Sequence, residues 1–405
     1  MSDAHEEPTP SAATPTEAPI ADTEWVPVGR YSAQPMAPAQ PIDPQPIEAA
    51  QPVVPTQPID AAPSASPADE PEVAVSPARG PLSAELVPAS EHRALAVRDA
   101  RERPSFLQYE RPEEPAREGL RGALNRLGFR LAPGDAEQAV RNNELAVSQH
   151  WPGPRTIAIV NGKGGAGKTP TTVLLSAVFA RYGGAGVLAW DNNQTRGTLG
   201  WRTETGPHDR TLLEMLPEAD RLLGTAAQSA DLAYFVHHQP REKYDVLRSK
   251  PIRLAHENRL SPDDVDAVHA VAAKFYRLIF IDSGNDESDP MWLRMIDHAD
   301  QIVIATTTRS DHAEAGALLL EALADRDERS AQLARRSVVV VSQADPKATY
   351  AEVDRVVDGY RNLAREVVTI PFDQEMVDGH LRYGSLAKPT QRAWLVAAAA
   401  VARGL

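Results

Sequence analysis

Short hydrophobic runs alternate with stretches of helical periodicity through most of this chain of 405 residues. Continuous runs of β-branched and aliphatic residues between helices are typical of parallel strands that are buried on both faces of a sheet. We therefore predict a doubly wound, mostly parallel α/β domain over residues 151–405. The predicted strands are Thr156–Val160, Gly186–Trp190, Leu278–Asp282, Gln301–Thr306, Ser337–Ser342 and Val367–Ile370, with a further strand suggested at Tyr244–Leu247.

A second pattern, helical and rich in arginine, covers residues 94–150. Leu120, Leu124 and Leu127 are spaced for one face of a helix, and another helix is predicted to begin at Asp135. We interpret this segment as an Arg-rich helical extension that packs on the main domain. The alternative is a basic patch for an acidic partner or a nucleic acid.

Residues 1–93 have no such periodicity. Of the 35 prolines, 19 lie in the first 90 residues, and residues 1–93 hold 14 carboxylates against three arginines. A segment with so few large apolar residues cannot offset the entropy of an ordered chain, so we predict a disordered, acidic, Pro-rich tail. Four Gln-Pro pairs, each followed by Ile or Val, would suit a repeated docking motif; a solvated spacer is the simpler interpretation.

Composition narrows the classes of protein further. The chain has no cysteine, which excludes disulfides, thiolate zinc sites and iron–sulfur clusters. No apolar run approaches the roughly 20 residues that cross a bilayer, and the first 30 residues do not resemble a secretory signal. The histidines, including the pair His237-His238, show no metal-ligand spacing and are expected at the surface. We expect a soluble, cytoplasmic protein.

The most informative motif follows the first predicted strand. Residues 162–169 read Gly-Lys-Gly-Gly-Ala-Gly-Lys-Thr and fit the pattern G-x-x-x-x-G-K-[ST]. A helix is predicted from Thr171, so the motif has the strand–loop–helix context in which backbone amides and a helix N-terminus hold phosphates. Lys168 would neutralise the β- and γ-phosphates, and the Thr169 hydroxyl would hold Mg²⁺. The predicted nucleotide-binding residues are Gly162, Gly164, Gly165, Ala166, Gly167, Lys168, Thr169 and Pro170.

Lysine usage sharpens this interpretation. The chain has seven lysines among 42 basic residues, and two of the seven, Lys163 and Lys168, lie in this one loop. A compact ammonium is therefore expected at both positions, because a guanidinium would be too bulky there. The loop resembles the deviant Walker A motif of the MinD/ParA family of P-loop ATPases. The resemblance covers about 151–405, and it implies ATP, Mg²⁺ and an ATP-sandwich homodimer in which Lys163 reaches across the interface to the partner's nucleotide.

The family also places two carboxylates, spaced Asp-x-Asp, after the second strand, and the second of them orients the attacking water. By residue match, Asp191 takes the first position and Asn193 the second. An amide cannot accept the proton of water, so slow or partner-dependent hydrolysis is expected; the alternative is that Asp191 takes the catalytic role. Arg196 in the same segment would either respond to the γ-phosphate or pair with an acid.

Three later segments complete the resemblance. Asp282 ends an apolar strand and matches the Walker B carboxylate that holds Mg²⁺, and 283–285 would form switch II. Pro371 and Phe372 resemble the family's late segment beside the adenine base, with ordinary core packing as the alternative. The closing segment 392–405 lacks the basic face of the membrane-binding helix of MinD proteins, and we predict a packed helix and no membrane partner.

These observations leave three functions open. The leading one is an ATP-dependent dimerisation switch, a weak or partner-stimulated ATPase that positions or partitions cargo such as a DNA region or a polar protein complex. A net charge of −3 over 94–405 does not favour DNA. The second is a regulatory or scaffold protein of a secretion or cell-envelope machine that docks an unidentified partner through its Pro-rich tail. A Pro-rich acidic leader before a MinD-like domain resembles actinobacterial proteins associated with type VII (ESX) secretion, such as EspI. The third is a ligase of the kind used in biotin synthesis, for which the sequence offers no substrate pocket.

Overall fold

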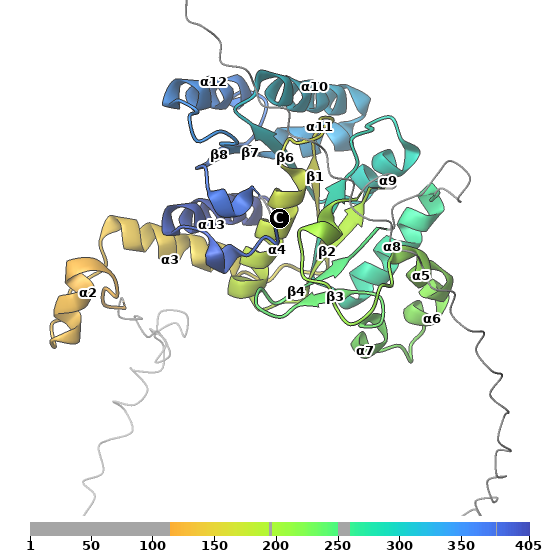
Figure 1. Cartoon of the computed structure of the whole chain (residues 1–405), viewed down its shortest axis with the longest axis horizontal. Helices are drawn as coiled ribbons and strands as arrows, with labels where there is room; N and C mark the ends of the chain where they lie inside the picture. The colour runs from red at the N-terminus through yellow and green to blue at the C-terminus, as the bar shows by residue number, and fades with distance from the viewer. Residues whose placement is uncertain (1–113, 194–196, 250–259, 378) are drawn as a thin grey trace, which may run out of the picture. The chain divides into compact units, whose positions relative to one another are not determined.

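The computed structural model describes residues 114–193, 197–249, 260–377 and 379–405 (Figure 1). The chain divides into two units, 1–102 and 103–405, and all of the described residues belong to the second. The interpretation of residues 1–93 as a disordered tail and the alternatives for Arg196 therefore lie outside the described residues.

A single sheet forms the centre of the second unit. Among the described residues it has eight strands in the order β3-β4-β2-β5-β1-β6-β7-β8. Neighbouring strands are parallel except for the edge pair β3 and β4, which is antiparallel. The strands are β1 (Arg155–Val160), β2 (Val187–Asn192), β3 (His237–Gln239), β4 (Tyr244–Leu247), β5 (Leu278–Ser283), β6 (Gln301–Thr307), β7 (Val338–Ser342) and β8 (Glu366–Ile370).

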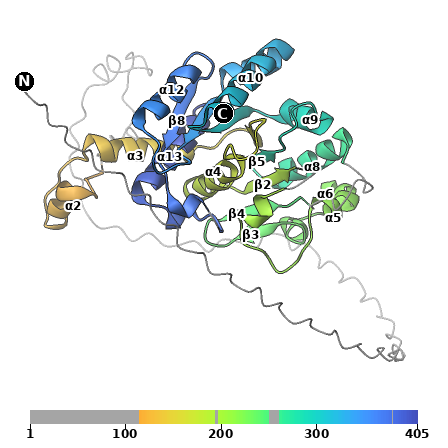
Figure 2. The same cartoon turned by 45° about the horizontal axis from the view of Figure 1, so that its top comes forward.

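Helices cover both faces of this sheet (Figures 1 and 2). On one face, α3, α4 and α13 pack against strand residues such as Ile157 and Ile159; on the other, α8 to α12 pack against Ala158 and Val160. The helices are α2 (Gly119–Arg126), α3 (Asp135–Val147), α4 (Lys168–Gly183), α5 (Leu212–Met215), α6 (Ala219–Leu223), α7 (Ser229–Leu232), α8 (Pro262–Phe275), α9 (Pro290–His298), α10 (Ser310–Arg326), α11 (Glu328–Arg335), α12 (Tyr350–Tyr360) and α13 (Lys388–Ala402), with short 3₁₀ turns at Leu199–Trp201, Leu216–Glu218, Gln374–Met376 and Tyr383–Ser385. The predicted doubly wound α/β fold is confirmed.

The predicted strands are all present, and the suggested strand at Tyr244–Leu247 is β4. Strand β3 was not predicted, because three residues that include two histidines carry no apolar pattern. The expectation of surface histidines is wrong for His237, which is completely buried, and for His312, which is 5% exposed; His238, beside His237, is exposed. The His237 ring instead contacts backbone groups, with Nδ1 accepting from the Gly206 amide at 3.1 Å.

The helical extension buries apolar side chains in the domain through α3, while Glu118, at the N-cap of α2, pairs with Arg392 of α13 at 3.0 Å. The end of α3 buries Ala146 and Val147 in the same core as α13 and α4. By contrast, the leucines of the α2 segment do not form a buried face: Leu120, Leu124 and Leu127 are 86%, 40% and 78% exposed. Polar contacts hold this segment, since the Asn125 side chain bonds the backbone of Ala116 and of Leu131.

The final helix, α13, is packed as predicted. Trp394 and the stretch 397–401 are fully buried against the sheet and α4. In the part of the chain that the structure describes, no helix is both long enough and apolar enough to cross a membrane.

A histidine pair lies where α8 and α9 meet the start of β1. The rings of His269 and His298 are stacked, with their centroids 4.0 Å apart. His298 Nε2 contacts Asp266 at 2.6 Å, and the same carboxylate receives Arg294, while His269 Nε2 lies 2.9 Å from the Thr156 hydroxyl. Burial and the neighbouring His298 lower the pKa of His269 to about 4, and only Asp266 opposes this.

This lowered pKa predicts a loss of stability in mild acid. The unfolded chain binds a proton at His269 near pH 6.5 and the folded chain only near pH 4, so the folded state is fully favoured above pH 6.5 and loses stability as the pH falls towards 4. We expect His269→Gln to remove about 1 kcal/mol of the difference in unfolding free energy between pH 7 and pH 5, allowing for the partial exposure of the ring. Urea unfolding at both pH values measures it. The exposed His238→Gln serves as the control, and an unchanged pH dependence in His269→Gln would contradict the prediction.

Candidate phosphate-binding site

The glycine-rich loop lies at the carboxyl end of the central strand β1 and leads directly into α4. Two of its glycines have left-handed backbone angles, with φ of +81° at Gly165 and +94° at Gly167. Residues with a side chain rarely adopt this region, so glycine is needed for the loop to turn back on itself. The turn places the N-terminus of α4, with the backbone amides of its first turn, beside the carboxyl ends of the parallel strands, where open α/β folds bind ligands.

Lys168 is the best-anchored side chain of the loop. It is buried, and its Nζ donates to the carbonyl oxygens of Asn161 and Lys163 at 2.8 and 3.0 Å. A third bond goes to Oδ1 of Asn285 at 2.6 Å, in the segment expected to be switch II. Burial lowers the pKa of Lys168, while the carboxylates of Asp282 and Glu287 raise it. The ammonium is thus held at the base of the loop by three protein oxygens.

The two residues expected to hold Mg²⁺ lie in direct contact. The Thr169 hydroxyl donates to Oδ2 of Asp282 at 2.6 Å, and it also lies 2.7 Å from the Thr198 hydroxyl. The other oxygen of Asp282 is buried and has no hydrogen-bond partner, which is the state of an oxygen that fits a cation. The described residues hold no cluster of three or more His, Cys, Asp or Glu for a metal. The Thr169 hydroxyl and the Asp282 carboxylate are oxygen donors of the kind that Mg²⁺ takes in proteins, together with phosphates and water.

A cavity of about 460 Å³ opens in front of these groups, within the range of small-ligand sites. It is lined by Gly164, Gly165, Gly167, Lys168, Thr169, Pro170, Asn193, Thr198, Trp201, Arg202, Asp282, Ser283 and Asn285. The structure therefore brings together most of the residues predicted from the loop and from both acidic segments. Lys163 is exposed, and its backbone amide donates to Asn161 Oδ1 at 2.9 Å.

Asp191 and Asn193 occupy different environments. Asp191 is only 1% exposed, within β2 and in register with Asp282 on β5, and its Oδ1 accepts the Asn193 amide at 3.1 Å. Burial raises the pKa of Asp191, and the charge of Asp282 adds to the effect. Gly197 lies against its second oxygen, where a side chain would not fit. Asn193 lines the cavity and Asp191 does not.

Pro371 and Phe372 follow β8 and are partly buried. Neither is among the residues that line the cavity. The Phe372 amide donates to Oε1 of Gln343 at 3.2 Å, which links the ends of β7 and β8. Their place beside an adenine base stays a prediction.

The sequence analysis missed two residues that support the loop. Asn161 is completely buried, and its Nδ2 donates to the carbonyls of Ala305 and His312 at 2.9 and 3.0 Å. The His312 ring lies next to Gly165, and its Nδ1 is 2.8 Å from the Thr307 hydroxyl. A polar residue between a buried strand and a glycine loop is a local signal for Asn161; nothing near His312 in the sequence indicates its role.

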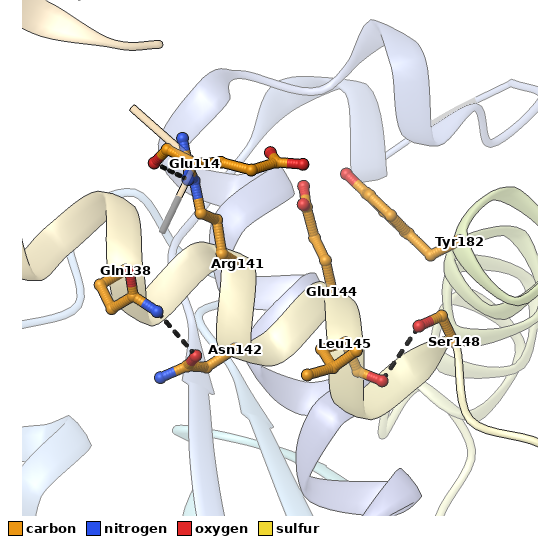
Figure 3. Close-up of a pocket in the computed structure, with 8 residues that line it drawn as sticks. All are labelled: Glu114, Gln138, Arg141, Asn142, Glu144, Leu145, Ser148 and Tyr182. Atoms are coloured by element: carbon orange, nitrogen blue, oxygen red, sulfur yellow. Dashed lines mark hydrogen bonds between the residues drawn. The ribbon is translucent and has the colours of Figure 1, made fainter. Parts of the chain in front are cut away.

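A slightly larger hollow, of about 510 Å³, lies between α3 and the end of α4 (Figure 3). Its lining residues are Glu114, Gln138, Arg141, Asn142, Glu144, Leu145, Ser148 and Tyr182. None of them belongs to the glycine-rich loop, and the Arg141 guanidinium is already bound to the carbonyls of Glu114 and Pro115. The volume of a cavity therefore does not identify the candidate site. The 460 Å³ cavity is the candidate because Lys168, Thr169 and Asp282 all line it.

Residues 154–324 match the family model of an AAA domain. The chain is 24% identical over 263 residues to the ESX-1 secretion-associated protein EspI of Mycobacterium tuberculosis strains H37Rv and CDC 1551. This match covers 64% of the chain and 37% of the length of those relatives.

Two solved structures are also similar. A ParA family ATPase from Chlorobium tepidum is 20% identical, with a TM-score of 0.49 over 61% of this chain and 98% of that one. The septum site-determining protein MinD of Pyrococcus horikoshii, complexed with Mg-ADP, is 19% identical, with a TM-score of 0.44 over 60% of this chain and 94% of that one. The resemblance to EspI that the sequence indicates is confirmed by the identity over 263 residues, and residues 154–324 match an AAA domain.

Proposed function

We propose that this chain binds ATP with Mg²⁺ at the glycine-rich loop. The observation that carries the proposal is the contact set of Lys168, Thr169 and Asp282: a buried ammonium, a hydroxyl and a carboxylate with one unsatisfied oxygen, all at the N-terminus of α4. Lys168 and the loop amides would bind the phosphates, and Thr169 and Asp282 would hold Mg²⁺. When bound, the metal would neutralise charge on the phosphates.

We further propose that ATP makes the chain a homodimer. Lys163 is exposed although the backbone on both sides of its side chain is fixed, since its amide bonds Asn161 and its carbonyl accepts Lys168. Its side chain is therefore available to a second copy without any change in the loop. This supports the trans-acting role that the family resemblance implies, with weak or partner-stimulated hydrolysis.

Two functions are open to this dimerisation switch. The match to EspI supports a regulatory role in a secretion machine, in which the nucleotide sets the conformation and the Pro-rich tail docks a protein partner. Positioning of a cargo, whether a DNA region or a polar protein complex, is the second candidate, supported by the resemblance of the loop to the MinD/ParA motif. Gel shifts at low salt with ATP test the DNA version of the second candidate, because it requires binding to DNA that weakens steeply with salt.

Light scattering tests the switch itself. The molar mass of the full chain, 43.9 kDa as a monomer, is measured with ATP·Mg²⁺ and then with ADP·Mg²⁺. We expect the molar mass to double with ATP·Mg²⁺ and to stay that of the monomer with ADP·Mg²⁺. The same mass with both nucleotides would count against the dimerisation switch, and calorimetric titration with ATP then shows whether nucleotide binding survives without it.

A further inference from the structure

A short segment after β2, residues 197–203, lies against the first turn of α4. The Thr198 hydroxyl is 2.7 Å from the hydroxyl of Thr169, the second residue of that helix. The segment continues as the 3₁₀ turn Leu199–Trp201, in which Leu199 is completely buried. The start of this segment is therefore held beside the groups that would bind Mg²⁺.

The end of the same segment is held by the chain that follows β8. The backbone carbonyl of Arg202 accepts the Leu381 amide at 2.8 Å. The Arg202 guanidinium donates to the carbonyls of Met376 and Val377 at 2.7 and 3.3 Å. Because both ends of the segment are anchored, the side chain between them is presented at a defined place.

That side chain is Trp201. It is 62% exposed and lines the cavity in front of the glycine-rich loop. Of the described residues that line this cavity, Trp201 is the one with an aromatic side chain. By contrast, Trp190, Trp292 and Trp394 are at most 3% exposed. The segment thus holds a large, flat apolar surface open to a ligand of the cavity.

The cavity therefore offers two kinds of surface to a ligand. Lys168, Thr169 and Asp282 supply charge and oxygen donors for phosphates and a metal. Trp201 supplies neither, and a phosphate alone would leave its indole uncovered. A nucleotide matches both surfaces, because it joins a charged phosphate chain to a flat base, and bases stack favourably on aromatic side chains.

We propose that Trp201 stacks on the base of the nucleotide whose phosphates bind the glycine-rich loop; this rests on the proposed ATP binding. Every base has a π-face, so the indole adds affinity for a nucleotide without choosing between adenine and guanine. Phe372, which is partly buried and does not line the cavity, is the competing aromatic residue. A second copy of the chain is the competing occupant of the exposed indole.

Titrations with ADP·Mg²⁺ test this role on the full chain, because ADP is expected to leave the chain monomeric. We expect Trp201→Ala to weaken ADP binding by about tenfold and Trp201→Phe to stay within about threefold of the native affinity. Tyr350→Ala is the matched control: Tyr350 is 87% exposed and does not line the cavity, so its loss should leave ADP affinity unchanged. Displacement of ADP by tripolyphosphate, which has no base, should give one affinity for native, Trp201→Phe and Trp201→Ala chains.

Tryptophan fluorescence provides an independent measurement. A base stacked on an indole quenches its emission, so ADP·Mg²⁺ should lower the emission of the native chain and tripolyphosphate should not. Trp201→Phe keeps the other tryptophans of the chain, and we expect it to lose this quenching while it still binds ADP. This separates contact with the base from a change in the shape of the loop.

Three results would overturn the role of Trp201. One is native ADP affinity in Trp201→Ala; if this variant also fails to double its mass with ATP·Mg²⁺, the indole contacts a second copy instead. Another is an equal loss of affinity for ADP and tripolyphosphate, which would mean that the substitution distorts the phosphate site. The third is a tenfold loss in Phe372→Ala with none in Trp201→Ala. A native chain that binds neither ADP nor ATP would overturn the proposed function itself.

Discussion

A chain in which Lys168 is replaced by alanine is expected to bind ATP at least about 100-fold more weakly than the native chain. The substitution removes the buried ammonium that three oxygens, from Asn161, Lys163 and Asn285, now hold at the base of the loop. A charged hydrogen-bonding group in such a site contributes about 3 kcal/mol to the binding of a phosphate, which corresponds to about 100-fold in Kd. Calorimetric titration with ATP·Mg²⁺ measures the effect.

Two further variants make this result specific. Lys347→Ala removes an exposed lysine far along the chain and should leave the affinity for ATP unchanged. Lys168→Arg keeps the charge but needs room for a planar guanidinium in a buried position, so we expect it to bind ATP nearly as poorly as the alanine variant. Native affinity in Lys168→Ala would mean that the loop is not the nucleotide site.

Lys163→Ala is expected to have the opposite effect: its affinity for ATP stays within about threefold of the native value, and ATP-dependent dimerisation is lost. Its backbone makes the contacts that shape the loop, and these do not depend on the side chain. The exposed ammonium would act only on the nucleotide of the partner. Because a symmetric homodimer has two such contacts, each of about 2 kcal/mol, their loss lowers the dimerisation constant by about 10³-fold. Light scattering at micromolar protein with ATP·Mg²⁺ provides the measurement.

Two results for Lys163→Ala would contradict this prediction. A Lys163→Ala chain that dimerises with ATP as strongly as the native chain would exclude the trans-acting role of the lysine. If the variant loses ATP binding as well, Lys163 acts within its own chain. The Lys347→Ala chain again serves as the matched control, because it loses one exposed ammonium from a residue that is not among those lining the phosphate cavity.

Local sequence patterns predict the core strands and the glycine-rich loop, because each of these elements is formed by consecutive residues. Strands such as Gln301–Thr307 are buried on both faces and read as continuous apolar runs, whereas β3 is too short to show a pattern. The left-handed angles at Gly165 and Gly167 follow directly from the motif.

Contacts between distant segments were not predictable in this way. The bond from Lys168 to Asn285 joins residues 117 positions apart, and those from Asn161 to the carbonyls of Ala305 and His312 join residues 144 and 151 positions apart. Such contacts depend on which strands end next to one another along the carboxyl ends of the parallel strands. The hydrophobic periodicity of the sequence does not show this order. The exposed leucines of the α2 segment show the converse: helical spacing predicts a face but not that the rest of the chain covers it.

The packing of α3 also has a practical meaning for anyone who shortens this protein. Val147 is fully buried beside the small side chains of α13, although the composition changes only at Trp151, just before the phosphate-loop strand. A fragment that began at Trp151 would expose part of that apolar surface to water and would tend to aggregate. We therefore expect a fragment that keeps the whole of α3, from Asp135, to aggregate less than one that begins at Trp151.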